Sequence, residues 1–109
     1  MTLLLFSAPQ KGLAVLRLTR DPKTSTRRIT FAIPADAASG NVSVVGDFND
    51  WTPGRNVLRR RSNGTLSAAV PVPAGATLRF RYLGENGVWF DDPEADFIDP
   101  HGSVVKIPA

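Results

Sequence analysis

Residues 42–51 of the chain read VSVVGDFNDW, a β-branched run that passes directly into a short polar segment. Valine packs well on a pleated surface, so positions 41–45 predict a short strand. Gly46 suits a tight backbone bend, and the short polar residues after it are of the types that hydrogen-bond to nearby backbone in loops. The segment therefore predicts a strand that ends in a structured loop.

The side chains of this loop have different expected roles. Asp47 is expected to organise the loop through side-chain-to-backbone hydrogen bonds. Phe48 is expected to pack into the core. Trp51 is either an exposed binding residue or a core residue, because tryptophan is often largely buried.

The rest of the chain repeats short alternating runs of apolar residues separated by turn residues. In positions 78–82 three large apolar residues alternate with Arg79 and Arg81, so both guanidinium groups are expected to face outward. If Val88 and Phe90 face the core, the intervening Trp89 faces outward as well. Two tryptophans left in water predict a surface that a ligand or partner covers.

Turn chemistry supports an all-β fold. Asn63-Gly64 is a strong hairpin signal and is expected to join the runs on either side of it. No stretch shows helical periodicity over ten residues. The chain therefore predicts an immunoglobulin-like β-sandwich of about seven or eight short antiparallel strands, with a small closed barrel as the alternative. The predicted strands are 14–18, 28–33, 41–45, 57–61, 66–72, 78–82, 88–90 and 103–107.

Length and composition limit the domain count and the function classes. A chain of 109 residues fits one domain; residues 1–26 are expected to form an N-terminal segment that can add an edge strand to a module over 27–109. There is no cysteine, which excludes disulfides and thiol chemistry. The net charge of +3 does not argue for nucleic-acid binding, and no apolar run approaches membrane-spanning length. We expect a cytoplasmic domain with neither a nucleic-acid nor a membrane partner.

Each of two charged runs can be interpreted either as a structural feature or as a binding or catalytic site. The acidic run from Asp91 to Asp99, followed by His101, is expected to be a solvated loop, since it lacks the spacing of a calcium loop and the cleft that a glycosidase needs. We therefore expect no catalytic residue, no metal and no cofactor. The run Arg59-Arg60-Arg61 is expected to protect a sheet edge, with phosphate binding as the lesser alternative.

The pattern Gly46-Asp47-Phe48-Asn49-Asp50-Trp51 resembles the hallmark of family 48 carbohydrate-binding modules, which include isoamylase N-terminal domains and the glycogen-binding domain of the AMP-activated protein kinase beta subunit. Three further elements of that family follow in order. They are the Pro73-Ala74-Gly75 turn, the strand Phe80-Arg81-Tyr82, and Gly87-Val88-Trp89 with the later Asp91-Asp92-Pro93.

The resemblance implies an early-set immunoglobulin-like domain over residues 27–109 that binds α-1,4-glucan such as glycogen, starch or maltodextrin without cleaving it. By position it implies that Trp51, Arg81 and Trp89 contact the sugar. The kinase modules carry a Thr-x-Asn element before the last strand, whereas this chain has Pro100-His101-Gly102-Ser103. The alternative is therefore a docking module for a glycogen-metabolising enzyme or kinase, with a weak or vestigial sugar site.

Overall fold

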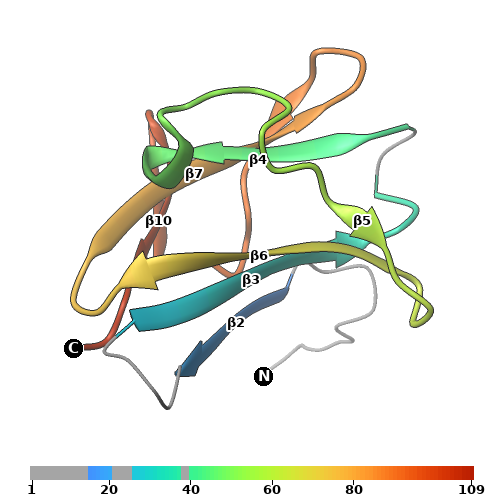
Figure 1. The fold of residues 1–109 in the computed structure, drawn as a ribbon. Coiled ribbons are helices and arrows are strands. Elements are labelled where there is room, and N and C mark those ends of the chain that lie inside the picture. Colours follow the sequence, from blue (N-terminus) through green and yellow to red (C-terminus); the bar gives the residue numbers. More distant parts are fainter. Residues whose placement is uncertain (1–14, 21–25, 38–39) are drawn as a thin grey trace, which may run out of the picture.

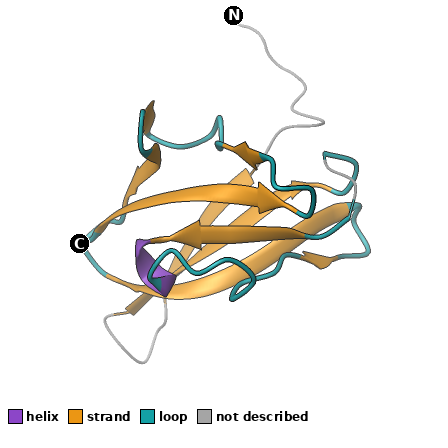
Figure 2. Ribbon diagram, turned by 90° about the horizontal axis from the view of Figure 1, so that it is seen from above, coloured by secondary structure: helices purple, strands orange, loops and turns teal. Residues whose placement is uncertain are grey.

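The computed structural model describes residues 15–20, 26–37 and 40–109, which form two antiparallel β-sheets packed face to face (Figure 1). The chain is an immunoglobulin-like β-sandwich, as the alternation and the turn residues predict. The C-terminus lies at the edge of the sandwich, and seen from above the strands of one sheet overlie those of the other (Figure 2). A 3-10 turn, Asp47–Asn49, is the one helix among the described residues.

The first sheet has the order β4-β7-β10-β9, and β8 also pairs with β7. The second sheet has the order β2-β3-β6-β5. The strands of the first sheet are β4 (Val42–Gly46), β7 (Thr77–Gly84), β8 (Trp89–Phe90), β9 (Phe97–Asp99) and β10 (Gly102–Lys106). Those of the second sheet are β2 (Val15–Arg20), β3 (Thr26–Pro34), β5 (Arg59–Arg60) and β6 (Thr65–Pro73).

Aromatic rings fill the centre of the space between the sheets. Phe31 from β3 lies with its ring centroid 4.8 Å from that of Phe80 and 5.4 Å from that of Phe48. Tyr82 packs on the same cluster and on Phe90, at 5.2 Å between centroids. Offset and edge-on pairs of this kind stabilise a core beyond the area that they bury. The predicted inward faces of β3 and β7, and the predicted core position of Phe48, are confirmed.

Three details of the expected strand pattern differ. Phe97–Asp99 forms β9, which was not predicted, because its two apolar residues do not alternate with polar ones. In the run 57–61 only Arg59–Arg60 is a strand, since Val57 instead bridges Ser43 of the other sheet. Of the two residues that flank Trp89, only Phe90 packs against the core; Val88 is 52% exposed because it closes the turn before β8.

The N-terminal part contributes one strand to the described structure. β2 pairs with β3 and forms an edge of the second sheet, and it lies within the segment expected to add an edge strand. Residues 1–14 and 21–25 lie outside the described part of the chain.

Candidate binding site

The strand β7 carries the centre of the candidate site on the face that points away from the core. Leu78, Phe80 and Tyr82 are buried, so Arg79 and Arg81 point to the outer side, as predicted. Opposed residues of antiparallel strands share a face of the sheet. Trp89, which pairs with the residue after Tyr82, therefore lies on the same outer face as Arg81, and it is 46% exposed.

Trp51 reaches β7 from the other side, through the loop that follows β4. Its indole Nε1–H donates a hydrogen bond of 3.0 Å to Oδ1 of Asp47. The other oxygen of that carboxylate accepts the backbone N–H of Arg79 at 2.9 Å. Asp47 thus ties Trp51 to β7 and continues the strand pairing after β4 has ended. This confirms the organising role that was expected for Asp47.

The loop holds Trp51 in a backbone conformation that L-residues rarely adopt. Asp50 and Trp51 both have φ of 55°, in the left-handed region. Asn49 stabilises this turn from below, since its amide donates to the carbonyl of Val44 and its Oδ1 accepts from the N–H of Gly46. Trp51 is 36% exposed. The loop therefore presents an indole that is anchored at its nitrogen and open to solvent.

The interpretation of Gly46 as a bend was wrong. Its φ of −171° is extended backbone that any residue adopts. Glycine is required there for lack of room: a Cβ would lie 2.6 Å from the carbonyl oxygen of Arg79 and 2.8 Å from Cβ of Phe80. The absent side chain lets the Asp47 loop sit directly against β7.

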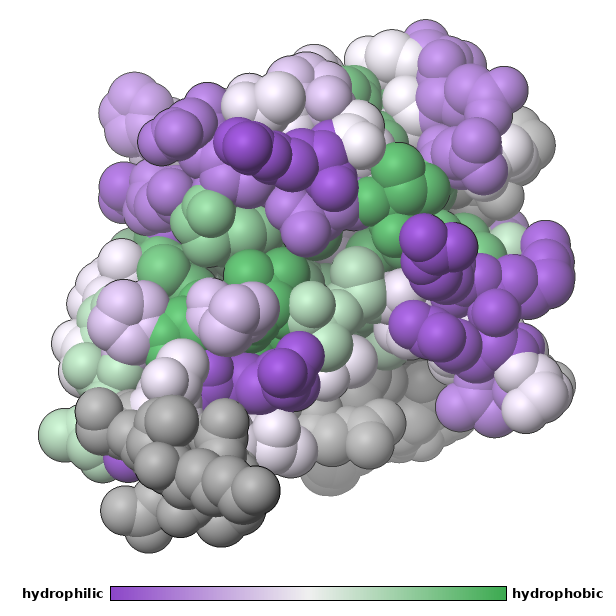
Figure 3. Space-filling view, viewed as in Figure 1, coloured by the Kyte–Doolittle hydropathy of each residue, from purple (hydrophilic) through white to green (hydrophobic). Residues whose placement is uncertain are grey.

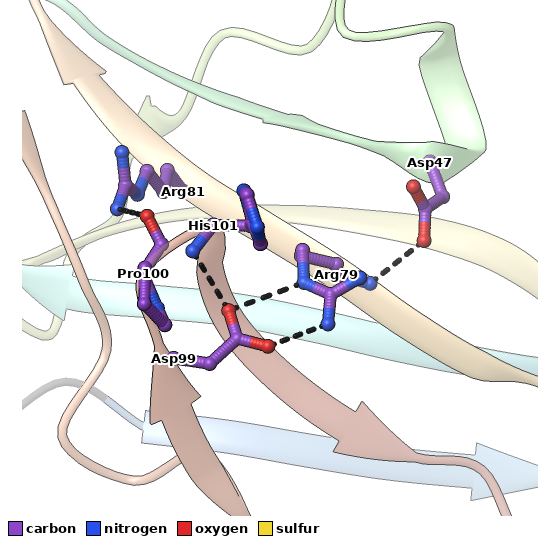
Figure 4. Close-up of polar contacts among 6 residues, drawn as sticks. All are labelled: Asp47, Arg79, Arg81, Asp99, Pro100 and His101. Carbon is purple, nitrogen blue, oxygen red and sulfur yellow. Dashed lines mark hydrogen bonds and ion pairs between the residues drawn. The ribbon is translucent and has the colours of Figure 1, made fainter.

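Arg81 is held on both sides of its guanidinium group. Its Nη2 donates a hydrogen bond of 3.0 Å to the carbonyl of Pro100, which Figure 4 shows reaching toward it. Its Nε lies 3.4 Å from Oδ1 of Asp91 and makes no hydrogen bond. Gly102, directly before the Ser103–Phe80 pair of β10 and β7, lies beside Arg81: a Cβ there would lie 3.3 Å from Cγ of Arg81. The aliphatic part of the Arg81 side chain therefore packs against the backbone of Gly102. The carbonyl oxygen of Pro100 and the carboxylate of Asp91 orient its guanidinium group.

Behind Arg81 a chain of hydrogen bonds leads into the core. The Ser103 hydroxyl donates to Asp91 at 2.9 Å and accepts from the backbone N–H of Asp92 at 2.9 Å. The buried carboxylate of Asp92 accepts a hydrogen bond of 2.5 Å from the Tyr82 hydroxyl. Burial raises the pKa of Asp92, and the hydrogen bond from Tyr82 opposes that rise. The acidic run is therefore not simply a solvated loop: Asp92 is fully buried because the phenol inside the core needs an acceptor.

The end of the acidic run organises a second arginine. Asp99 accepts a hydrogen bond of 2.6 Å from Nη2 of Arg79 and another from the backbone N–H of His101 (Figure 4). The hydrogen bond from Arg79 lowers the pKa of Asp99. The two ion pairs of the described residues, Arg79–Asp99 and Arg81–Asp91, thus lie side by side on the outer face of β7. Within the described ranges no group of three or more histidine or acidic residues is arranged to hold a metal ion.

In the part of the chain that the structure describes, no helix is long and apolar enough to cross a bilayer.

Comparison with known proteins identifies the family. The family described as carbohydrate-binding module 48 (isoamylase N-terminal domain) matches residues 16–102, which include β7 and all three candidate residues. This chain belongs to that family. The match begins inside β2 and therefore covers nearly all of the described domain.

Relatives of this module are branching enzymes. The 1,4-alpha-glucan branching enzyme GlgB 1 of Rhizobium johnstonii is 44% identical over 62 residues, covering 55% of this chain and 8% of the enzyme. GlgB of Deinococcus radiodurans is 36% identical over 80 residues, covering 72% of the chain and 10% of the enzyme. GlgB of Aliivibrio fischeri is 32% identical over 95 residues, covering 84% and 12%. The chain spans about a tenth of the length of these relatives, so the matches concern one domain of each enzyme.

The structure brings Arg81 and Trp89 together on one face and anchors Trp51 next to the same strand. Asp47, which holds Trp51, is bonded to Arg79, and Trp89 pairs with Leu83. These two positions on β7 are four residues apart, which corresponds to about 13 Å along the strand. Sequence reasoning missed Asp91 as the residue beside Arg81. The signal was weak, because Asp91 stands in a run of acidic residues with no feature that separates it from the others.

Proposed function

We propose that this family 48 module binds α-1,4-glucan, such as glycogen, starch or maltodextrin, through Trp51, Arg81 and Trp89, and that it does not cleave it. The observation that carries the proposal is the grouping of two exposed indoles around one half-buried arginine on β7. Indole faces stack on the C–H faces of pyranose rings, and a guanidinium group donates hydrogen bonds to the hydroxyls between them.

Two contacts fix the orientation of the Arg81 guanidinium group, and this supports a binding role. Its contacts with Pro100 and Asp91 leave Nη1 without a partner among the described residues. An arginine fixed before binding loses less conformational entropy when the ligand arrives. We therefore assign Asp91 and the Pro100 carbonyl as positioning groups that direct the free edge of Arg81 toward sugar hydroxyls.

Co-sedimentation with glycogen and tryptophan fluorescence titration with a maltooligosaccharide test this proposal. Trp51→Ala and Trp89→Ala are each expected to weaken binding by roughly tenfold or more, the usual cost of removing an aromatic anchor. Ile98→Ala is the matched control: Ile98 is exposed to a similar degree but pairs with Ser103, on the other side of the sheet. No saturable response at millimolar sugar, or equal affinity in the wild type and in Trp51→Ala, contradicts the proposal.

A docking role is the second candidate, and the edge strand β9 supports it. Phe97 and Ile98 are 48% and 50% exposed, and β9 pairs with β10 alone. An exposed apolar edge of this kind suits a protein partner, and the branching enzymes suggest a glycogen-metabolising enzyme. Pull-down from extract depleted of glycogen tests it: Phe97→Asp is expected to abolish capture while sugar binding persists. A cytoplasmic location, expected mainly from the lack of a membrane-spanning apolar run, stays a prediction.

A further inference from the structure

Two groups of arginines in the sandwich differ in whether carboxylates accompany them. Every carboxylate from position 91 to 99 belongs to the first sheet and its loops, where two of them pair with Arg79 and Arg81. Arg55, Arg59 and Arg61 lie before, on and directly after the edge strand β5 of the second sheet, and none of the three takes part in an ion pair among the described residues. Figure 3 shows hydrophilic residues gathered over β5 and the turn after it.

These three arginines line one hollow of about 490 Å³. It opens between the segment 54–57 on one side and strands β5 and β6 on the other. No carboxylate lines it. Besides the three arginines, Asn56 and Ser67 contribute polar groups to the lining.

One of the three guanidinium groups is fixed in place. Nε of Arg61 donates a hydrogen bond of 2.8 Å to Oγ of Ser67, and its Nη2 lies 3.4 Å from the carbonyl oxygen of the same residue. Ser67 is the register partner of Arg59, so Arg59 and Arg61 lie over the same residue of β6. Nη1 of Arg61 and the whole guanidinium of Arg59 keep their donors available to a ligand.

Guanidinium groups that converge without a carboxylate repel one another, and an oxyanion between them removes that repulsion. Phosphate matches such a cluster because its oxygens accept paired N–H donors from arginine. A charged sheet edge alone also discourages aggregation. Protection against aggregation, however, requires neither the hollow nor the hydrogen bonds that fix Arg61. Arg60, which lies on the opposite face of β5 and outside the hollow, would protect the edge equally well.

We propose that the hollow lined by Arg55, Arg59 and Arg61 is a binding site for a phosphate monoester, separate from the sugar surface on β7. Arg59 and Arg61 contact the phosphate oxygens, and Arg55 adds charge from the facing segment. The volume of the hollow leaves room for a group larger than phosphate, such as the sugar of a sugar phosphate. A phosphate attached to a glucan chain presents the same chemistry.

The test is a titration of the whole chain with inorganic phosphate at constant ionic strength, followed by amide chemical shifts. Arg59→Gln and Arg61→Gln are each expected to weaken phosphate binding roughly three- to tenfold, as the loss of one charge-assisted contact at an accessible site does. Arg60→Gln removes the same charge from the same strand and is expected to leave the affinity unchanged. Thermal unfolding of each variant checks the fold, and Arg59→Gln leaves the Arg61–Ser67 contact intact.

Two further arms identify the source of the phosphate. Glucose 6-phosphate is expected to shift the same amides as inorganic phosphate, and phosphorylated dextrin is expected to shift both these and the tryptophan signals of the β7 surface. Binding is expected to be stronger at pH 7.5 than at pH 5.5, because a phosphate monoester gains its second charge near pH 6. Absence of a saturable shift overturns the proposal, as does an equal loss in Arg60→Gln or an equal response to uncharged glucose.

Discussion

Replacement of Gly46 by alanine tests how the site is built, because this position requires glycine for space and not for backbone freedom. The added Cβ would lie 2.6 Å from the carbonyl oxygen of Arg79, and 2.8 Å from both Cβ of Phe80 and Cε2 of Phe48. Real Cβ contacts are not that short. The carbonyl oxygen of Arg79 and Cβ of Phe80 cannot move away on their own, because both are bonded directly to the backbone of β7. Either β7 or the loop that begins at Asp47 must therefore move.

The size of the effect follows from the overpacking of a filled core. Such changes typically cost about 1–3 kcal/mol. In a domain of this size each kcal/mol corresponds to about 4–8 °C in Tm. We expect Gly46→Ala to lower Tm by roughly 5–20 °C and to weaken glucan binding as well, since Asp47 and with it Trp51 are displaced from Arg79.

Urea denaturation followed by circular dichroism measures the loss of stability, and glycogen co-sedimentation measures the loss of binding. Gly75→Ala is the matched control. A Cβ at Gly75 meets nothing within 4 Å, but its φ is +81°, so that variant reports backbone strain alone, about 1 kcal/mol. Stability of Gly46→Ala within about 0.5 kcal/mol of the wild type refutes the reasoning.

Asp47→Ala is expected to reduce the free energy of unfolding by about 1–2 kcal/mol and to weaken sugar binding, because it releases the indole of Trp51; unchanged affinity in fluorescence titration would separate Asp47 from the site. Asp91→Asn is expected to weaken binding roughly fivefold in the wild type and to have no further effect in an Arg81→Ala background; equal effects in both backgrounds would reveal a merely structural role. The hydrogen bond from its arginine partner lowers the pKa of Asp99 in the folded state, so its contribution to stability is complete above the unfolded value near 4 and is lost as pH falls below it. Asp99→Asn is therefore expected to be less stable than the wild type at pH 7, with a difference in thermal unfolding that narrows as the pH falls to 2.5; a difference that does not narrow would contradict this.

The outward direction of Arg81 and Trp89 was predictable, whereas the surroundings of Arg81 were not. Alternation along β7 fixes which side chains leave the core, and it needs no knowledge of distant residues. The contact with Asp91 joins two segments through the pairing of β8 and β10 with β7, and no local pattern marks it. The same applies to the hollow beside Arg59, which exists because residues 54–57 pass across the edge of the sandwich.

The fold class, the inward faces of β3 and β7 and the three residues that we propose contact sugar could all be predicted from the sequence. Each follows from period-two alternation, from turn residues or from a local motif, all of which act between near neighbours. Three features became clear only in the folded molecule: why Gly46 is glycine, why Asp92 is buried and that Phe97 lies in a strand. In each case the deciding group comes from a distant position and acts only once the sheets have formed; these groups are the carbonyl of Arg79, the hydroxyl of Tyr82 and the strand β10.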